Sequence, residues 1–215
     1  MAFDYPPLSL QVWGDFAVFT RPELKVERVT YPVMTPSAAR GVLESVFWKP
    51  EFIWQIHEIH VLRPIVYFSI NRNEVNSRAS ERSAAKWERE GGGYVASADR
   101  SQRHTLALRD VAYRIIASPR LHPHATDDPA KYRDQFRRRV KKGQCYSTPY
   151  LGCREFAAAF GEVDNTPPIA HSEHLGNMLL DMDYATDGSG RGEPRFFQAE
   201  LVNGVLRVPN SESEA

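Results

Sequence analysis

Residues 8–20 read LSLQVWGDFAVFT, and residues 35–50 read TPSAARGVLESVFWKP. The first stretch is rich in β-branched and aromatic residues that partly alternate with polar ones, which predicts a strand. In the second stretch Thr35 can cap a helix and Pro36 suits its first turn, so it predicts a helix that Lys49-Pro50 ends. One side of this helix is apolar, which suits packing on a sheet; it comprises Ala39, Val42, Val46 and Phe47.

The order of the remaining elements extends this pattern. A β-rich stretch covers residues 52–70, and strand character returns over residues 106–117. A second helix is expected over Pro129–Lys142, because Asp127-Asp128 can cap its start and Gly143 can close it. Strand, helix, strand, strand and helix in this order begin a ferredoxin-like sandwich, the arrangement that RRM-type RNA-binding domains also use.

Two further regions lie outside this pattern. Residues 71–103 are polar and charged and include a glycine run at 91–93, so they predict a long loop or a flexible hairpin insertion outside the core. From Leu151 onward the chain predicts short strands, with a final hairpin over residues 195–208 that turns at Asn203-Gly204. The length fits one large domain, or a main domain with a smaller appendage.

The bulk composition is that of an ordinary folded protein of 215 residues, 42% hydrophobic and 25% charged. No apolar run approaches the roughly 20 residues that a membrane span needs, and residues 1–7 lack the basic start and apolar stretch of a signal peptide. The two cysteines, Cys145 and Cys153, are too few for a disulfide framework. A cytoplasmic protein with reduced thiols and no membrane partner is therefore expected.

Charge is distributed unevenly, although 27 basic and 27 acidic residues leave the chain formally neutral. Residues 131–142 carry seven basic side chains and one acidic one, whereas residues 155–193 carry eight acidic side chains and one basic one. A polyanion responds to the local patch rather than to the average, so the basic segment is a candidate nucleic-acid surface. The alternative is an ordinary solvated helix face.

Helical spacing divides this basic segment into two faces. Tyr132, Phe136 and Val140 form an apolar stripe that would pack on the sheet, with Tyr132 at its edge. A second stripe would face outward; it comprises Lys131, Gln135, Arg138 and Lys142. Lys131 and Arg138 are therefore candidate phosphate contacts, while Tyr132 is either a core tyrosine or a functional hydroxyl.

The sequence offers little for metal, nucleotide or acyl-transfer chemistry. It contains neither a phosphate-binding glycine signature nor a nucleophile elbow. The spacing of its candidate zinc ligands suits no common module, so no metal or other cofactor is expected; these ligands are Cys145, Cys153, His171 and His174. Asp181 and Asp183 alternate along a predicted strand, which leaves a metal-dependent nuclease as a further alternative.

Two kinds of side chain outside the basic helix could also act on RNA. His122 and His124 lie on a loop just before that helix, where a histidine is a candidate proton carrier. Exposed aromatic rings can stack bases, although aromatic residues in strands more often belong to the core. The candidate rings are Trp13, Trp48, Trp54, Trp87, Tyr146 and Tyr150.

Three segments together resemble the type I-C Cas-five proteins, which belong to the RAMP superfamily of CRISPR systems. They are LQVWGDFAVFT at residues 10–20, GVLESVFWKP at residues 41–50 and YLGCREF at residues 150–156. The similarity runs from about Leu8 to Val208. It implies an α+β fold with a ferredoxin-like (RRM-like) domain at residues 1–148, an insertion in it at about 71–103, and a small antiparallel β-sheet domain at residues 149–210.

The resemblance also implies a function. The family binds the hairpin of the CRISPR repeat in precursor RNA and cuts at its base without a metal, using the ribose 2′-OH as nucleophile and leaving a cyclic phosphate. The product, the mature crRNA, stays bound, and the protein remains a subunit of the type I-C surveillance complex. Expected partners are therefore precursor and mature CRISPR RNA and the other subunits of that complex, with a contact to DNA as a further option.

In relatives the cleavage site combines a tyrosine at the end of the first helix with a Lys-His pair at the start of the second. The corresponding residues here are Phe47, Lys131 and Tyr132, so the lysine is kept and the other two positions differ. Lys131 can stabilise the charge that develops on the phosphate, whereas a tyrosine, with an ordinary pKa of about 10, is a poor base at neutral pH. The expected RNA-binding residues are Arg133, Arg137, Arg138, Arg139, Lys141 and Lys142.

Two activities stay open at this point. Retention of Lys131 and of the basic helix favours an endoribonuclease that also serves as a structural subunit. Phe47, which has no proton to exchange, favours a non-catalytic subunit that binds the 5′ handle of the crRNA. In the first case Tyr132 or a loop histidine would assist the reaction.

Overall fold

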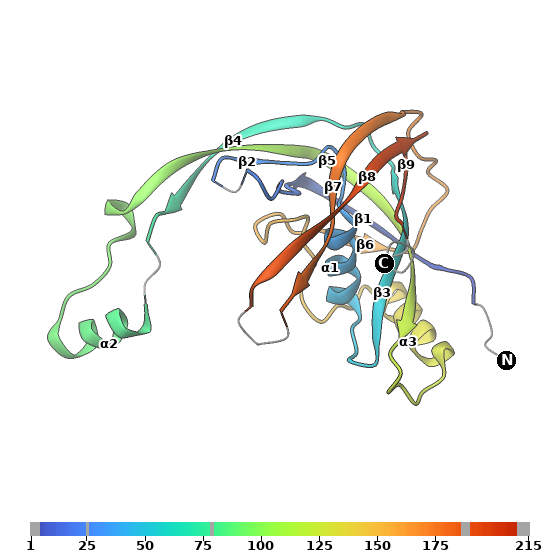
Figure 1. Cartoon of the computed structure of the whole chain (residues 1–215), viewed down its shortest axis with the longest axis horizontal. Coiled ribbons are helices and arrows are strands. Elements are labelled where there is room, and N and C mark those ends of the chain that lie inside the picture. Colours follow the sequence, from blue (N-terminus) through green and yellow to red (C-terminus); the bar gives the residue numbers. More distant parts are fainter. Residues whose placement is uncertain (1–4, 25, 78–79, 186–189, 210–215) are drawn as a thin grey trace.

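The computed structural model describes residues 5–24, 26–77, 80–185 and 190–209, which form a curled, mainly antiparallel sheet with a few helices (Figure 1). The helices are α1 (Pro36–Val46), α2 (Glu81–Glu90) and α3 (Pro129–Lys141), with one 3₁₀ turn at Ala96–Ala98. The strands are β1 (Leu8–Ala17), β2 (Arg28–Val29), β3 (Phe52–Val61), β4 (Tyr67–Val75), β5 (Arg100–Leu121), β6 (Ala159–Gly161), β7 (Glu173–Tyr184), β8 (Gly192–Val202) and β9 (Val205–Arg207).

All of these strands belong to one sheet. Its main path runs β6-β1-β5-β3-β9-β8-β7, while β2 and β4 pair with β5 beside this path. The pairings are antiparallel except for the short contact between β2 and β5. An α+β fold is therefore confirmed. None of the helices in the described part of the chain is long and apolar enough to cross a membrane.

The first predicted strand and helix are both present. β1 turns alternate residues inward, among them Leu8 and Leu10. α1 begins where expected, because the Thr35 hydroxyl accepts a hydrogen bond from the Ala38 backbone N–H at 3.3 Å. The helix ends at Val46, earlier than predicted, because Phe47 adopts an extended conformation with φ at −154°.

β5 is the longest strand and organises the sheet. Its second half lies between β1 and β3, while its first half pairs with β4. The β-rich stretch at residues 52–70 is two strands rather than one, because the chain leaves β3 at Val61 and re-enters the sheet at Tyr67. The core lies between α1 and the sheet; its largest fully buried rings are Tyr31, Phe47, Phe52, Tyr113 and Phe136.

The predicted insertion is a two-stranded arm that projects from the body (Figure 1). Its strands are the outer parts of β4 and β5, and α2 lies at its tip. No described residue of α2 is buried, so the tip of this arm lies outside the core. The helix itself was not predicted; it begins at Ser80, whose hydroxyl accepts from the Ser83 N–H at 3.1 Å.

α3 matches the prediction closely. The Asp128 side chain caps its start by accepting from the Ala130 N–H at 2.7 Å, and Gly143 follows its end with φ at +60°. The predicted apolar stripe of this helix is buried. Its Phe136 ring packs against the Trp54 ring of β3, with centroids 4.8 Å apart.

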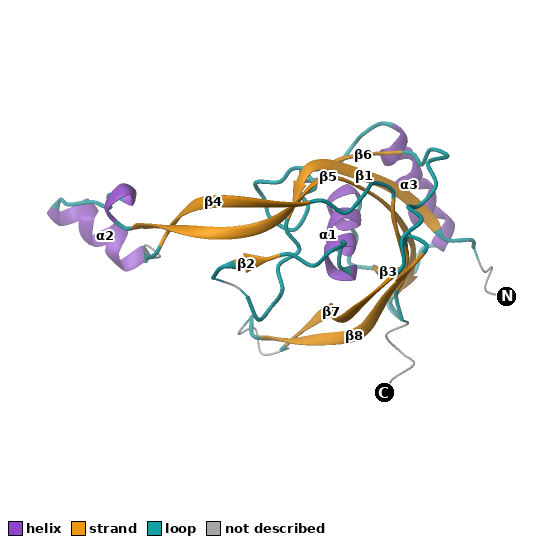
Figure 2. Ribbon diagram, turned by 90° about the horizontal axis from the view of Figure 1, so that it is seen from above, coloured by secondary structure: helices purple, strands orange, loops and turns teal. Residues whose placement is uncertain are grey.

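The C-terminal strands continue the sheet beyond β3 instead of standing apart from it. β9 pairs with β3, and β8 and β7 follow outward, so that the sheet curls around α1 (Figure 2). The predicted turn at Asn203-Gly204 is confirmed, with φ at +48° and +74° as a two-residue hairpin with positive φ at both positions requires. The strand expected at residues 151–153 does not form, and β6 is the part of residues 156–163 that pairs.

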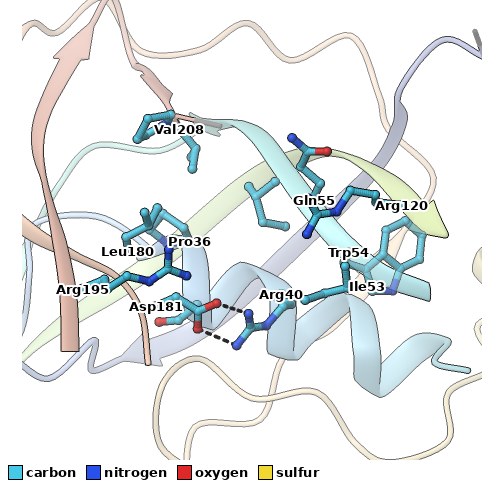
Figure 3. Close-up of a pocket in the computed structure, with 13 residues that line it drawn as sticks. Pro36, Arg40, Ile53, Trp54, Gln55, Arg120, Leu180, Asp181, Arg195 and Val208 are labelled. Atoms are coloured by element: carbon cyan, nitrogen blue, oxygen red, sulfur yellow. Dashed lines mark hydrogen bonds and ion pairs between the residues drawn. The ribbon is translucent and has the colours of Figure 1, made fainter. Parts of the chain in front are cut away.

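An ion pair joins the outermost C-terminal strand of this curl to the helix that the curl surrounds. Both terminal nitrogens of Arg40 on α1 donate to the Asp181 carboxylate on β7, one of them at 2.6 Å, beside a hollow of about 120 Å³ (Figure 3). Burial opposes the charge of Arg40, but the hydrogen bond and the charge of Asp181 outweigh it and raise the pKa of Arg40. Arg40 and Asp181, two of the polar residues that line this hollow, therefore hold β7 against α1.

Candidate functional site

The fold brings the end of α1 and the first turn of α3 together, although some 80 residues separate them in sequence. Phe47, directly after α1, is buried, and its ring centroid lies 5.6 Å from that of Phe52 at the start of β3. The Phe52 ring in turn lies 5.3 Å from that of Tyr132 on α3. The three residues that the resemblance assigns to cleavage, Phe47, Lys131 and Tyr132, thus lie in one region.

Lys131 faces solvent at this junction. Its side chain is 61% exposed, and its ammonium donates to the Asp127 carboxylate at 2.6 Å. This hydrogen bond raises the pKa of Lys131, with the negative charges of Asp127 and Glu51 adding to the effect. The side chain is therefore a fixed positive charge at neutral pH and not a proton acceptor.

Tyr132 has the opposite environment. The residue is 3% exposed, and its hydroxyl is buried without a normal hydrogen bond to any described residue. Burial raises the pKa of Tyr132, and the charges of Glu51 and Asp127 act in the same direction. A buried phenol with a raised pKa is even less ionised at neutral pH than an ordinary tyrosine and cannot accept a proton there, so Tyr132 contributes to this region through packing.

A turn that carries two histidines lies beside these residues. The His122 backbone N–H donates to the Glu51 carbonyl at 2.8 Å, and Nε2 of His124 lies 3.1 Å from the Pro50 carbonyl oxygen. The two imidazole rings stack with centroids 5.4 Å apart and planes 10° apart. The predicted proton carriers of the loop therefore sit against the segment that follows α1.

Glu51 was not identified from the sequence. One of its carboxylate oxygens is buried without a hydrogen-bond partner among the described residues, and its charge acts on both Lys131 and Tyr132. A single glutamate after Lys49-Pro50 belongs to no sequence motif that would mark it as a site residue. Its place in the site follows from the pairing of β3 with β5, which sets the start of β3 beside the entry to α3.

The six basic residues expected to bind RNA have two different environments. Arg133 is buried: it donates to the Pro6 carbonyl, lies over the Tyr5 ring, and its pKa is lowered by burial. Arg139 donates to the Val46 carbonyl at 2.8 Å and lies over the Phe47 ring at 5.4 Å. These two guanidinium groups therefore secure the N-terminal segment and the end of α1.

The other four basic residues of α3 face outward. Arg137, Arg138, Lys141 and Lys142 are exposed and line a hollow of about 510 Å³. The same hollow is lined by the N-terminal segment Pro7, Leu8 and Ser9 and by Glu162 and Val163. The arrangement is an open positive groove whose floor is partly apolar, which suits a phosphate backbone.

Two aromatic side chains stand exposed near the end of α1. Trp48 directly follows Phe47 and is 55% exposed. Tyr146 is 88% exposed, while its backbone N–H donates to the Ser45 carbonyl at 2.7 Å, which fixes the loop beside the helix end. Exposed rings on a fixed backbone can stack unpaired bases. The other candidate rings include Trp54, which is buried, and Trp87, which stacks on Tyr94 in the arm.

The candidate metal ligands are dispersed or already paired. Cys145 is exposed, whereas Cys153 is buried and accepts a hydrogen bond from Arg28 at 3.2 Å. Asp181 is paired with Arg40, and Asp183 forms an ion pair with Arg195 at an N···O distance of 2.8 Å. Within the described ranges, no three histidine, cysteine, aspartate or glutamate side chains group closely enough to hold a metal ion.

Comparison with known proteins points to one family. The Cas5d family model, described as CRISPR-associated protein (Cas_Cas5), matches residues 8–209. A protein of Thermus thermophilus named CRISPR pre-crRNA endoribonuclease Cas5d is 45% identical, covering 94% of this chain and 91% of the relative. A protein of the same name from Mannheimia succiniciproducens is 43% identical, covering 94% of each chain.

Solved structures share the fold. One, described as a CRISPR-associated protein, has a TM-score of 0.68 at 21% identity and covers 97% of this chain and 95% of its own. Another, described as a CRISPR RNA-guided surveillance complex, has a TM-score of 0.56 at 14% identity and covers 95% of this chain and 92% of its own. With the family match over nearly the whole sequence, the chain belongs to the Cas5d family of CRISPR-associated proteins.

Proposed function

We propose that this protein binds the repeat hairpin of precursor CRISPR RNA and cuts it at its base as a metal-independent endoribonuclease. The observation that carries this proposal is the identity, 45% and 43% over 94% of the chain, to two proteins named CRISPR pre-crRNA endoribonuclease Cas5d. Identity of that extent over the whole chain makes a shared fold and a shared substrate class the simplest expectation. The end of α1 and the first turn of α3 lie close together beside the exposed Lys131, which is consistent with RNA cleavage at this place.

The outward face of α3 is the proposed contact for the RNA backbone. Arg137, Arg138, Lys141 and Lys142 present four positive charges along one groove, and phosphate contacts supply much of the affinity in protein–nucleic acid complexes. The exposed rings of Trp48 and Tyr146 would receive bases that leave the hairpin near the cut. Backbone contacts and base contacts would thus flank the end of α1 from two sides.

The chemistry proposed is transesterification within the RNA. The 2′-oxygen attacks the adjacent phosphorus, the bond to the 5′-oxygen breaks, and a 2′,3′-cyclic phosphate and a 5′-hydroxyl remain. Negative charge grows on the phosphate oxygens in the transition state, and the Lys131 ammonium, which Asp127 keeps protonated, would stabilise that charge.

The protein would keep its product and act as a subunit of the type I-C surveillance complex. This part of the proposal is supported by the fold shared with a chain of a CRISPR RNA-guided surveillance complex. The arm formed by β4, α2 and β5 buries no described residue of α2, so its surface is open to the crRNA, to DNA or to a neighbouring subunit. A cytoplasmic location, where CRISPR transcripts are made, fits this role.

We infer that the first part of the chain is a ferredoxin-like unit. Supporting this, α1 connects β1 to β3 and α3 connects β5 to β6, while the strands lie in the order β6-β1-β5-β3, so each connected pair has another strand between its members. This is the split βαβ arrangement of ferredoxin-like folds. A boundary at residues 148 and 149 would place β6 in the second domain, although β6 pairs with β1, so we propose that the unit extends to Gly161 and that β7–β9 form the C-terminal part.

Incubation of the pure protein with its own repeat hairpin in EDTA tests the function. We expect one cut that leaves a cyclic phosphate, and no cut when the nucleotide on the 5′ side of the cut carries a 2′-deoxyribose. Tight binding without any cut would instead establish the non-catalytic 5′-handle subunit, which the buried hydroxyl of Tyr132 and the phenyl ring of Phe47 favour. Cutting only after magnesium is added would establish the metal-dependent alternative.

A further inference from the structure

Cleavage by the ribose 2′-OH needs one group that accepts the hydroxyl proton and another that protonates the leaving 5′-oxygen. The family positions supply no proton acceptor in this fold. Phe47 has no ionisable group, the Tyr132 hydroxyl is buried, and Lys131 is held as a cation by Asp127. The group that accepts the proton must therefore lie elsewhere around the junction of α1 and α3, and an imidazole there can serve as acceptor or as donor.

The turn over residues 122–125 is fixed beside this junction. The His122 N–H donates to the Glu51 carbonyl at 2.8 Å, and the Ala125 N–H donates to the His122 carbonyl at 3.0 Å. Both histidine side chains are exposed, so a bound RNA strand can reach them. The two rings are stacked, with centroids 5.4 Å apart and planes 10° apart, so both lie at one place on this turn.

The contact with Pro50 determines which nitrogen of His124 carries the proton. A carbonyl oxygen can only accept, so at 3.1 Å the Nε2 of neutral His124 must donate to it. Nδ1 then has a free lone pair and is the proton acceptor of the ring. A backbone contact that sets the tautomer in this way prepares an imidazole to act as a base at neutral pH.

Glu51 connects this turn to Lys131. Its backbone carbonyl holds His122, while the charge of its carboxylate acts on Lys131 and Tyr132 in the first turn of α3. The histidine pair and the Lys131 ammonium therefore lie around the same short segment after α1. One phosphate placed there would have a cation and two imidazoles within the same site.

Resting on the proposed function, we propose that His124 is the general base and His122 the general acid of RNA cleavage. Nδ1 of His124 takes the proton of the 2′-OH as the bond from the 2′-oxygen to phosphorus forms. The bond from phosphorus to the 5′-oxygen breaks, and the imidazolium of His122 gives its proton to that oxygen. One proton is accepted and one is given, so the reaction yields the cyclic phosphate and the 5′-hydroxyl without water, metal or oxidant.

Single-turnover cleavage at saturating protein in EDTA tests both assignments. His124→Gln keeps a donor for the Pro50 carbonyl but cannot accept the proton, and His122→Gln cannot give one; each is expected to slow the cut by about 100-fold or more. Hairpin affinity, measured separately, should stay unchanged for both. His174→Ala is the matched control, since this exposed histidine of β7 contacts Glu200 at the other end of the sheet path, and it should cut at the wild-type rate.

A modified substrate separates the two roles. With sulfur in place of the leaving 5′-oxygen, the leaving thiolate, whose conjugate acid has a pKa of about 8.5, needs no proton. His122→Gln should then cut this RNA at the wild-type rate, while His124→Gln stays slow. Should His124→Gln fold poorly, His124→Ala with imidazole added to the buffer replaces it, and recovery of the rate by imidazole is expected.

The outcomes distinguish this inference from the proposed function. If the wild-type protein does not cut the hairpin at all, the proposed function fails and the inference fails with it. If the wild-type protein cuts and both glutamine variants cut equally fast, the histidine assignment is overturned while the endoribonuclease stands. The histidine assignment is also overturned if the glutamine variants lose affinity for the hairpin but keep the wild-type cleavage rate. It is overturned as well if the RNA with the 5′-sulfur does not restore the cleavage rate of His122→Gln.

Discussion

Lys131 and Tyr132 are neighbours in the chain, yet the fold gives them opposite environments. A helix turns successive residues by about 100°, so one side chain meets solvent and Asp127 while the next enters the core against Phe52. At the scale of the residue, a family alignment therefore marks the right place but cannot say which side chain is able to react. Exposure and hydrogen bonding decide that.

Lys131→Ala should be the most damaging single substitution among the family positions. Loss of one donor that stabilises developing charge typically slows a reaction by about 100- to 1,000-fold, with little change in ground-state binding. Tyr132→Phe removes a buried hydroxyl that makes no normal hydrogen bond to a described residue, so it should leave cleavage near the wild-type rate and should not lower stability. Single-turnover rates in EDTA and thermal melts of both variants check this; equal rates for Lys131→Ala and wild type would contradict it.

For the RNA with sulfur at the leaving 5′ position, which needs no proton from His122, the alkaline limit of cleavage should depend on Asp127. Because its hydrogen bond raises the pKa of Lys131, the ammonium is fully present below the ordinary lysine pKa of about 10.4 and is lost only as pH rises through the higher folded-state value. Asp127→Asn should therefore move the fall of the rate to lower pH. A pH profile of single-turnover cleavage for both proteins measures this shift, and coincident alkaline limbs would refute the role of Asp127.

At the scale of the element, α3 combines two tasks on different faces. Its inner arginines hold neighbouring backbone: Arg133 donates to the Pro6 carbonyl and Arg139 to the Val46 carbonyl. Its outer charges line the groove at Pro7–Ser9. A count of basic residues in the segment does not separate these tasks, because both kinds of arginine contribute the same charge to the sequence.

Substitutions within α3 should separate binding from stability. Replacing Arg137 and Arg138 with Ala should weaken hairpin binding and make its logarithmic salt dependence shallower by about 1.4–1.8, since each of two phosphate contacts contributes about 0.7–0.9. Arg139→Ala should instead destabilise the fold by about 1–2 kcal/mol through loss of its bond to Val46 and its contact with Phe47. Salt titrations and urea unfolding test the two effects, and an unchanged salt slope would remove the outer face from the interface.

The arm formed by the outer parts of β4 and β5 and by α2 should contribute little to the stability of the body. α2 has 10 residues and no buried side chain, and helices shorter than about 12–15 residues are marginal in water without packing. Limited proteolysis of the free protein should therefore cut within residues 80–98 first. A variant in which a short turn replaces residues 76–99 should keep the melting temperature of the body; a clear drop would show that the arm supports the core.

At the scale of the whole molecule, the curl of the sheet depends on contacts between its distant parts. β9 joins the C-terminal strands to β3, and Arg40 joins α1 to β7 through Asp181. These contacts enclose α1, so the C-terminal strands stabilise the helix whose end forms the candidate site. A change that loosens the C-terminal strands should therefore lower the stability of the fold and also shift the end of α1 at the candidate site.

Asp181→Asn should destabilise the protein by about 1–2 kcal/mol, less than the 3–5 kcal/mol of a fully buried pair because this pair is partly exposed. Asp183→Asn is the matched control two residues along β7. Its partner Arg195 is more exposed, so the expected change is within about 1 kcal/mol. Urea unfolding of both variants measures the difference, and equal losses would mean that the Arg40 pair does not hold the curl.

The sequence by itself determined the local elements whose signals lie within a few residues. The Thr35 and Asp128 caps, the apolar stripe of α3 and the turn at Asn203-Gly204 all follow from side-chain chemistry that acts along the chain. The family also follows from the sequence, because its three segments occur in the expected order. These features needed no knowledge of distant contacts.

Tertiary structure alone decided how these elements combine. The end of α1 at Phe47, the burial of Tyr132 and the place of Glu51 depend on β5 pairing with β1 and β3 across long sequence separations. The same holds for the different environments of the arginines of α3, some buried against backbone and others exposed, and for the contact between His124 and Pro50. The physical reason is that burial, charge and tautomer are set by neighbours in space, which a linear pattern of residue types does not contain.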